Sequence, residues 1–161
     1  MIRIRNFDEF FRLDFCEPLA LVTSHYEGKS NVLTVGWTTL AALNPFSMAI
    51  TIAKTRYSHN IIKNSNEFVI AYPDVSMEEI VSYCGSVSGR NEDKISKLAN
   101  LPAIYVKAPL LINCILNIEC QVTGSLDVGS HTLFVGRVQA MHRAEGHKRL
   151  YHFGGGQYRT C

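Results

Sequence analysis

The chain has 161 residues, 47% of them hydrophobic and 19% charged, which is typical of one globular domain over residues 1–161 and not of a disordered chain. Sixteen basic and 14 acidic residues give a net charge of +2, with no basic run, which argues against a nucleic-acid partner. No apolar run approaches the roughly 20 residues that cross a bilayer, and charges interrupt the N-terminal stretch where a signal peptide is apolar, so we expect a cytoplasmic protein with no membrane partner.

Short apolar runs with a period of two dominate the chain and predict strands. The predicted strands are Leu19–Tyr26, Val32–Thr38, Ser47–Ala53, Glu67–Ala71, Asn113–Thr123 and His131–Arg143. The turn Glu27–Ser30 between the first two has the composition of a hairpin turn. Several strands at short intervals, with few helices in the connections, predict a mainly β protein with a closed or partly closed barrel.

Helical patterns are fewer. A short helix is expected to begin at Ser58, after the third predicted strand. The capping box Ser76–Glu79 predicts a second helix, because Met77, Ile80, Val81 and Cys84 follow at helical spacing. A third helix is predicted from Asn91 to Leu98.

The predicted strand Val32–Thr38 has two unlike faces. Leu33, Val35 and Trp37 alternate onto a face that we assign to the core. Thr34, Gly36 and Thr38, continued by Thr39, form a small face that bears hydroxyl groups. Small side chains let a flat ligand approach the backbone, and hydroxyl groups supply the few polar contacts that a pocket needs. The alternative is an edge strand whose threonines face solvent.

The connection Ala53–Ile61 leaves an apolar strand and enters the first predicted helix. Lys54 and Arg56 bring positive charge, and Ser58 and His59 bring hydrogen-bond donors. Together with the N–H groups of a helix start, these residues can form a phosphate cradle. The alternative is a solvated connection in which Ser58 only caps the helix.

Two further features are candidates for function. The glycine- and serine-rich segment Cys84–Ile95 joins two predicted helices, and Arg90 is its most notable side chain. His131 stands at a strand start, where it is either structural or a proton donor in a pocket.

The cysteines and histidines show no spacing that is diagnostic of chemistry. The five cysteines include no CxxC pair, so neither a zinc site nor a disulfide framework is expected. Cys114 and Cys120 fall on one face of a predicted strand, with Ile118 and other apolar residues, and are expected to be buried thiols. The six histidines are scattered, so we expect no metal site.

Several segments, taken in order, resemble the flavin reductase-like family of FMN-binding split-barrel proteins, particularly its flavoredoxin-like branch. The segments are "PLALVTSHYEGKSNVLTVGWTT", "NPFSMAITIAKTRYSHNI", "NEFVIAYP", "CGSVSGRNEDKI", "LNIECQV", "HTLFVGRV" and "GGGQY". The resemblance covers most of the chain. It implies a six-stranded Greek-key split β-barrel with a few short helices, and a homodimer with FMN near its interface.

The resemblance also implies positions for the cofactor. It places the flavin ring against Thr34, Val35, Gly36, Trp37, Thr38 and Thr39, and the phosphate at Lys54, Arg56, Ser58 and His59, with Tyr57 and Asn60 close by. Ser88, Gly89 and Arg90 match a loop near the flavin, and His131 matches a position beside the active site, where we expect it to be catalytic. Trp37 either fixes its strand from the core side or borders the flavin.

The function implied is an FMN-dependent oxidoreductase. Electrons would pass from NAD(P)H or a reduced protein donor through FMN to free flavin, ferric iron or a partner protein. Three alternatives stay open: an FMN electron carrier that does not turn over NAD(P)H, a related split-barrel FMN oxidase, and a β-barrel binding module without flavin.

Overall fold

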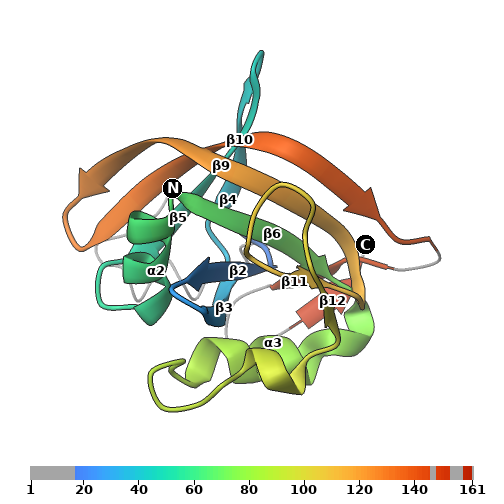
Figure 1. Ribbon diagram of the computed structural model, residues 1–161. Coiled ribbons are helices and arrows are strands. Elements are labelled where there is room, and N and C mark those ends of the chain that lie inside the picture. Colours follow the sequence, from blue (N-terminus) through green and yellow to red (C-terminus); the bar gives the residue numbers. More distant parts are fainter. Residues whose placement is uncertain (1–16, 146–147, 153–157, 161) are drawn as a thin grey trace, which may run out of the picture.

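The computed structural model describes residues 17–145, 148–152 and 158–160, and these residues are mainly β. The largest sheet has seven antiparallel strands in the order β3-β2-β6-β9-β10-β5-β4 (Figure 1). Its strands are β2 (Ala20–Tyr26), β3 (Lys29–Val35), β4 (Thr38–Leu43), β5 (Phe46–Ala53), β6 (Glu67–Pro73), β9 (Cys114–Val128) and β10 (His131–Arg143). All six predicted strands lie in this sheet, and β4 is the seventh.

Smaller elements surround this sheet. Strands β1 (Glu17–Pro18), β11 (Leu150–His152) and β12 (Tyr158–Thr160) form a three-stranded sheet, and β7 (Asn100–Leu101) pairs with β8 (Leu110–Leu111). The helices are α2 (Tyr57–Ser65) and α3 (Glu78–Ser86), with 3₁₀ turns η1 (Val75–Met77) and η2 (Ile95–Lys97). Among the described residues, no helix is both long enough and apolar enough to span a membrane.

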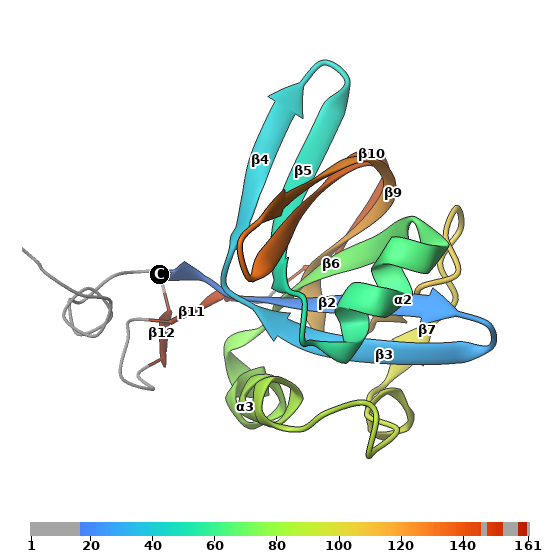
Figure 2. The same ribbon diagram turned by 90° about the vertical axis from the view of Figure 1, so that its left-hand side faces the viewer.

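The connection between the two edge strands makes the sheet a split barrel. The edges of the sheet are β3 and β4, yet only Gly36 and Trp37 separate them in the sequence. Because consecutive Cα atoms are about 3.8 Å apart, two edges joined by two residues must meet, and the sheet curls to bring them together. The β4–β5 hairpin then projects beyond the rest of the molecule (Figure 2). The predicted mainly β split-barrel class is confirmed, but the sheet has seven strands and not six, because β4 adds an edge strand after the two-residue connection.

Strand β2 is buried on both of its faces. Ala20 and Val22 point into the barrel, where they pack with Phe68, Ile70 and Phe134. Leu19 and Leu21 belong to a second cluster, with Val81 and Cys84 of α3. This double burial explains why β2 begins with a continuous apolar run, Ala20–Val22, and does not alternate there.

The β2–β3 hairpin confirms the predicted turn. Tyr26 pairs with Lys29, so the loop has two residues, Glu27 and Gly28, with φ of 47° and 77°. Two consecutive positive φ values are what a type I′ hairpin turn requires, and glycine at the second position adopts one without strain.

One predicted helix is absent, and the predicted start of another was wrong. The segment Asn91–Leu98 is not a helix but a loop containing only η2, because Lys94 is drawn into the protein and its neighbours make turn contacts. Ser76 does not begin its helix either. Asp74 accepts a hydrogen bond from the Ser76 N–H at 3.0 Å and caps η1, and α3 follows from Glu78.

The two cysteines of β9 are buried but do not share a face. Cys120 lies inside the barrel, whereas Cys114 belongs to the α3 cluster, where its Sγ is 3.8 Å from Met77 Sδ. The β6–β9 pairing shifts register between Tyr72 and Pro73, which breaks the alternation that had predicted one face. Burial raises the pKa of each thiol to about 12, so both are inert. Cys84 is buried as well, while Cys16 and Cys161 lie outside the described residues.

Glu119 is a fully buried carboxylate that anchors the loop before β8. It accepts hydrogen bonds from the N–H groups of Ile104, Tyr105 and Val106 at 2.6–3.2 Å, and His142 Nε2 lies 2.7 Å from it. Burial alone would raise the pKa of Glu119, but these hydrogen bonds outweigh it and hold the pKa below its ordinary value.

Candidate functional site

Two small cavities adjoin near the junction of β3, β5 and α2. The tryptophan cavity, of about 190 Å³, is lined by Glu17, Leu33–Trp37, Thr51–Ala53, Arg56 and His131. The cationic cavity, of about 210 Å³, is lined by Asn31, Leu33, Thr55–Ser58, Val87–Arg90 and Lys94. Leu33 and Arg56 line both cavities, so the two form one continuous, elongated site.

Trp37 borders the tryptophan cavity instead of packing in the core. Its side chain is 44% exposed, and its indole N–H donates to Glu17 Oε1 at 3.1 Å. Its ring lies 5.0 Å from the imidazole ring of His131. The core assignment of Trp37 was wrong because β3 ends at Val35, so Gly36 and Trp37 leave the alternation that puts Leu33 and Val35 inside.

The small polar face is divided by the same break in the strand. Thr34 and Gly36 line the tryptophan cavity, but the Thr34 hydroxyl donates to the Val81 carbonyl at 2.5 Å. A Cβ atom at Gly36 would lie 2.8 Å from Glu17 Oε2, so only glycine fits there without a shift of the carboxylate. Thr38 and Thr39 lie on β4, outside the lining of this cavity.

Thr38 and Thr39 differ in their surroundings. Thr38 is buried, and its hydroxyl has no hydrogen-bond partner among the described residues. A buried hydroxyl without a partner is uncommon, because its desolvation is not compensated. Thr39 is exposed and makes only a long hydrogen bond of 3.4 Å with the carbonyl of Leu40.

His131 begins β10 and faces the tryptophan cavity. Its Nδ1 is 2.8 Å from the Ser130 hydroxyl, so that hydrogen bond orients the ring. The other ring nitrogen, Nε2, has no hydrogen-bond partner among the described residues. It is therefore available to give a proton to a molecule in the cavity, or to accept one.

The cationic cavity is lined by three cations and by no carboxylate. Arg56 makes no hydrogen bond or ion pair through its guanidinium group with any residue that the structure describes. Arg90 donates to the Thr55 carbonyl at 3.1 Å and lies 5.4 Å from the centre of the Tyr57 ring. Because α2 begins at Tyr57, the positive end of its dipole also faces this cavity.

Lys94, which the sequence analysis did not identify, is the third cation. Only 2% of it is exposed, and its Nζ donates to the carbonyls of Cys84 and Val87, each at 2.9 Å, at the C-terminal end of α3. Burial lowers the pKa of its ammonium group. An ammonium group has three N–H donors, so one stays available to the cavity. A buried lysine inside a charged, polar segment has no sequence pattern that reveals it.

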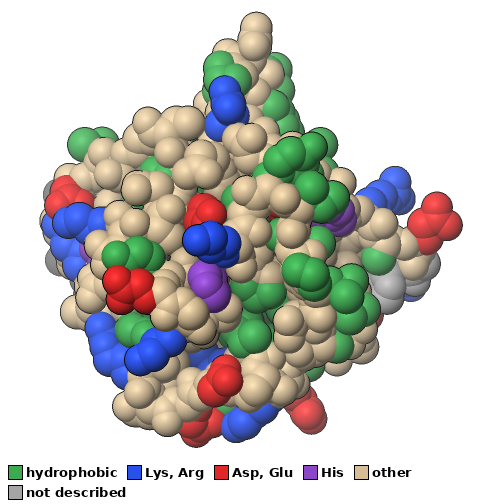
Figure 3. Space-filling view, in the orientation of Figure 1, with side chains coloured by type: hydrophobic (Ala, Val, Ile, Leu, Met, Phe, Trp, Pro, Cys, Tyr) green, Lys and Arg blue, Asp and Glu red, His purple; other side chains and the backbone are tan. Residues whose placement is uncertain are grey.

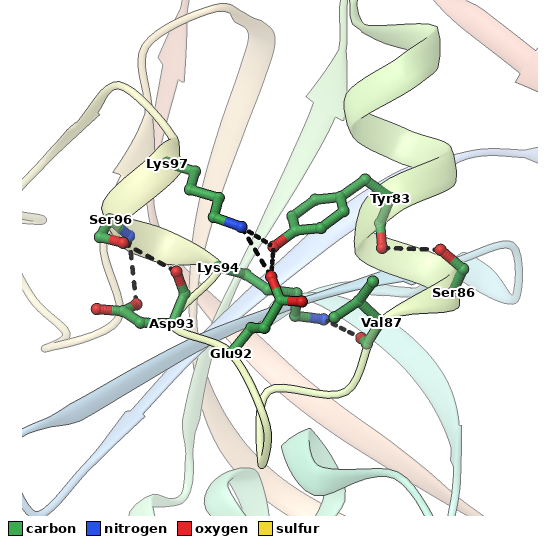
Figure 4. A network of polar contacts seen from close by, with 8 residues as sticks. All are labelled: Tyr83, Ser86, Val87, Glu92, Asp93, Lys94, Ser96 and Lys97. Atoms are coloured by element: carbon green, nitrogen blue, oxygen red, sulfur yellow. Dashed lines mark hydrogen bonds and ion pairs between the residues drawn. The ribbon is translucent and has the colours of Figure 1, made fainter.

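The loop that carries Lys94 is fixed by a polar network on its outer side (Figure 4). Tyr83 donates from its hydroxyl to Glu92 at 2.6 Å, and Lys97 donates to Glu92 at 2.7 Å and to the Tyr83 hydroxyl at 2.9 Å. Hydrogen bonds from Lys97 and Tyr83 lower the pKa of Glu92, which keeps this carboxylate ionised. The network ties the loop to α3.

Ser58 and Gly89 meet at Asn31, a lining residue that the sequence analysis also missed. Asn31 Nδ2 donates to the buried Ser58 hydroxyl at 2.8 Å. A Cβ atom at Gly89 would collide with Asn31 Oδ1. Glycine is therefore required for this loop to close against β3. Ser58 does not cap the helix, as the alternative interpretation of the connection had it, but lies inside the first turn of α2.

Lys54, His59 and Asn60 lie outside both cavities. Lys54 forms an ion pair of 3.1 Å with Asp127, while the buried His59 Nε2 lies 2.8 Å from the Thr132 hydroxyl. Thr132 in turn donates to Asp127 at 2.6 Å; this bond and Lys54 lower the Asp127 pKa. Both side chains are thus directed to the β9–β10 hairpin. Asn60 is exposed and lines a separate hollow.

Within the described residues, no group of three or more His, Cys, Asp or Glu side chains is arranged to hold a metal ion.

The sequence model of the flavin reductase-like domain matches residues 11–161. The chain belongs to the flavin reductase-like family. An uncharacterized protein of Pyrococcus abyssi is 36% identical over 132 residues, which cover 82% of this chain and 77% of that protein. The family predicted from the motifs is confirmed, and membership in it supports a flavin-related redox function.

Solved structures show the same fold. An FMN-binding protein from Thermus thermophilus with bound p-hydroxybenzaldehyde superposes with a TM-score of 0.90 at 24% identity, covering 99% of this chain and 94% of that chain. Flavoredoxin from Methanosarcina acetivorans superposes with a TM-score of 0.88, also at 24% identity, covering 100% of this chain and 91% of that chain.

Proposed function

We propose that this chain binds FMN and passes electrons through it from NAD(P)H or a reduced protein donor to an acceptor. One observation carries the proposal: a cavity lined by three cations and no carboxylate adjoins a cavity bordered by Trp37 and His131, with Arg56 in both. A ligand that fits this pair has a flat end and an anionic end. Similarity to an FMN-binding protein and to a flavoredoxin agrees with this assignment.

The phosphate would lie in the cationic cavity. Arg56 and Arg90 can each donate charge-assisted hydrogen bonds to it, and the start of α2 adds backbone N–H groups. Lys94 and Ser58 complete a set of donors that no carboxylate in the lining opposes. Ser88 and Gly89 belong to this end of the site, and Tyr57 forms its wall.

The flavin ring would lie in the tryptophan cavity. Thr34, Val35 and Gly36 let the ring approach the backbone, and Trp37 is held at its border by Glu17. Bound FMN supplies the hydride- and electron-transfer chemistry. His131, oriented by Ser130, would hold or move a proton at Nε2 beside the reacting substrate.

The proposal gives an indirect role to five of the predicted site residues: Lys54, His59, Asn60, Thr38 and Thr39. Their side chains line neither cavity, so we expect them to support the site and not to contact the phosphate or the ring directly. The unpartnered hydroxyl of Thr38 is the exception worth testing, because it lies two residues from Gly36.

A homodimer is part of the proposal. Leu40, Leu43 and Phe46 on the projecting β4–β5 hairpin are 49%, 77% and 36% exposed. Hydrophobic side chains also gather over the centre and right of the face in Figure 3, while charges of both signs are scattered over it. Exposed apolar surface of this kind is typical of protein interfaces, and a second copy would cover it. The cytoplasmic location and the single domain over residues 1–161 stay predictions.

The visible absorption spectrum of the purified chain with added FMN tests the proposal. We expect a bound flavin spectrum that bleaches when NADH is added without oxygen, and continuous NADH oxidation once an acceptor is supplied. Bound FMN with no NADH oxidation would favour the electron carrier. A protein that binds no added FMN would overturn the proposal.

A further inference from the structure

The end of the β9–β10 hairpin is bonded to the connection between β5 and α2 on both sides of Arg56. Two residues before Arg56, the Lys54 N–H donates to the Ser130 carbonyl at 2.9 Å. Three residues after it, His59 Nε2 lies 2.8 Å from the Thr132 hydroxyl. Ser130 and Thr132 stand on either side of the first residue of β10. One short stretch of the hairpin therefore holds the connection at two points.

The hydrogen positions in this contact follow from the partners of Thr132. The Thr132 hydroxyl has a single hydrogen, which it donates to Asp127 Oδ1 at 2.6 Å. This hydrogen bond and the ammonium group of Lys54 lower the pKa of Asp127, so its carboxylate is ionised and can only accept. The Thr132 oxygen must therefore accept from His59, and His59 Nε2 carries a hydrogen. The hydrogen bonds run in one direction, from His59 through Thr132 to Asp127.

The hydrogen bond between His59 and Thr132 is buried, unlike the ion pair beside it. Both side chains are buried, and the Phe134 ring lies 5.5 Å from the imidazole ring of His59. Lys54 and Asp127 are exposed, so water and salt screen their attraction. A buried donor that loses its partner is costly, whereas an exposed ion pair contributes little. The buried hydrogen bond is thus the stronger of the two side-chain ties.

This hydrogen bond reaches Arg56 through the backbone. The guanidinium group of Arg56 makes no hydrogen bond or ion pair with any residue that the structure describes, so its side chain does not fix its own position. The Arg56 N–H donates to the Ala53 carbonyl at 3.0 Å, and the Arg56 carbonyl accepts from the His59 N–H at 3.1 Å. Because the Arg56 carbonyl is bonded to His59, the placement of His59 determines the placement of Arg56.

We infer that Thr132 is a positioning residue for the phosphate: through His59 it holds Arg56 at the cationic cavity before a ligand binds. A binding group that is already in place loses less conformational freedom when its ligand arrives. His59 also lies in the first turn of α2, so the same bond fixes the N–H groups that face the cavity. The inference rests on the proposed function and deepens it, because Thr132 lines neither cavity.

The test compares FMN with riboflavin, which has the same ring system and no phosphate, by calorimetry on the full chain freed of flavin. Thr132→Val deletes the hydroxyl with little change of shape. His59→Leu breaks the same hydrogen bond but leaves Thr132 bonded to Asp127. Because His59→Leu leaves no buried donor unpaired, it carries the comparison if Thr132→Val does not fold.

Thr123→Val is the matched control for Thr132→Val. Thr123 is exposed on β9, and its hydroxyl donates to the Val135 carbonyl at 3.3 Å. It lines neither cavity. This variant should bind both flavins with unchanged affinity, and thermal unfolding of each flavin-free variant checks that it folds.

Thr132→Val and His59→Leu should each weaken FMN binding by about three- to tenfold, as expected for one hydrogen bond, and leave riboflavin affinity within about twofold. Thr132→Ser keeps the hydroxyl and should retain the FMN affinity of the unmodified chain. In an Arg56→Ala background, Thr132→Val should weaken FMN binding no further, because Thr132 acts through Arg56.

Other outcomes overturn the inference and leave the proposed function standing. Equal losses of FMN and riboflavin affinity, or no loss of either, would show that Thr132 does not position a phosphate-binding group. A loss that keeps its full size in the Arg56→Ala background would show that Thr132 acts without Arg56. If His59→Leu weakens FMN binding and Thr132→Val does not, His59 contacts the phosphate directly. If the unmodified chain binds neither flavin, the proposed function itself fails.

Discussion

Arg56 and Lys54 stand two residues apart in the same connection, yet the structure predicts opposite results for their removal. Arg56 lines both cavities, and its guanidinium group has no competing partner among the described residues. Lys54 is 3.1 Å from Asp127 and lines neither cavity. The Arg56→Ala variant should therefore lose FMN affinity, and the Lys54→Ala variant should keep it.

The size of the effect follows from the bonds that Arg56 would make. A hydrogen bond to a charged group contributes about 1.5–3 kcal/mol, so Arg56→Ala should weaken FMN binding by about 10- to 150-fold. Lys54→Ala removes only a distant, screened charge and should change the affinity by no more than about twofold. Quenching of FMN fluorescence at fixed ionic strength measures both constants.

Arg137→Ala is the matched control for Arg56, because Arg137 is exposed on β10 and lines neither cavity. Thermal unfolding of the flavin-free variants checks that each one folds. An affinity loss for Lys54→Ala that equals or exceeds the loss for Arg56→Ala would refute the assignment of the phosphate to the cationic cavity.

Four further outcomes are expected. Gly89→Ala should weaken FMN binding about tenfold, because the new methyl group displaces Asn31 and breaks its hydrogen bond to Ser58; titration with unchanged affinity would contradict this. Thr38→Val deletes an unpartnered buried hydroxyl, so the flavin-free chain should lose no stability in denaturant unfolding, and a fall in FMN affinity would show that the hydroxyl contacts the ligand. His131→Ala should leave FMN bound within about threefold but slow its reduction by NADH in stopped-flow measurements, and an unchanged rate would return His131 to a structural role. Glu119→Gln should lower the free energy of unfolding at pH 7 by about 2–4 kcal/mol. The pKa of Glu119 is lower in the folded than in the unfolded protein. The ionised carboxylate therefore contributes its full share to the free energy of unfolding above the unfolded pKa of about 4.3, and this share is lost as the pH falls through the folded pKa. The free energy of unfolding of the Glu119→Gln variant should accordingly change less with pH in acid.

The strand pattern of the sequence predicted the barrel well, because burial on one or both faces leaves a readable hydrophobic pattern. His131–Arg143 matches β10 residue for residue, and Ser47–Ala53 differs from β5 by one residue. The errors occur where chain geometry interrupts a pattern. Gly36 and Trp37 continue the alternation of β3 in the sequence, but in the structure they form the two-residue connection that lets the sheet close.

The candidate site could be located from the sequence, but the contacts within it could not. The three segments around Thr34, Arg56 and Arg90 do converge on one pair of cavities. Asn31 and Lys94 were missed because their roles arise from contacts with residues that are distant in the sequence or in another element. The ring of His59 points to Thr132, and the sequence could not show this, because a histidine at a helix start gives no sign of the direction of its ring.

Lys94, and not the predicted Lys54, lines the cationic cavity beside Arg56 and Arg90. Lys54 and Arg56 would have formed a cradle from one exposed connection, whose charges water and salt screen. The structure instead gathers Arg56 from the β5–α2 connection, and Arg90 and Lys94 from the loop after α3. Lys94 is buried and held by two carbonyl groups, so its charge acts on the cavity at a lower effective dielectric constant than a surface lysine would. An anion in this cavity therefore joins two separate parts of the fold, and its binding should stabilise the loop after α3 as much as it neutralises charge.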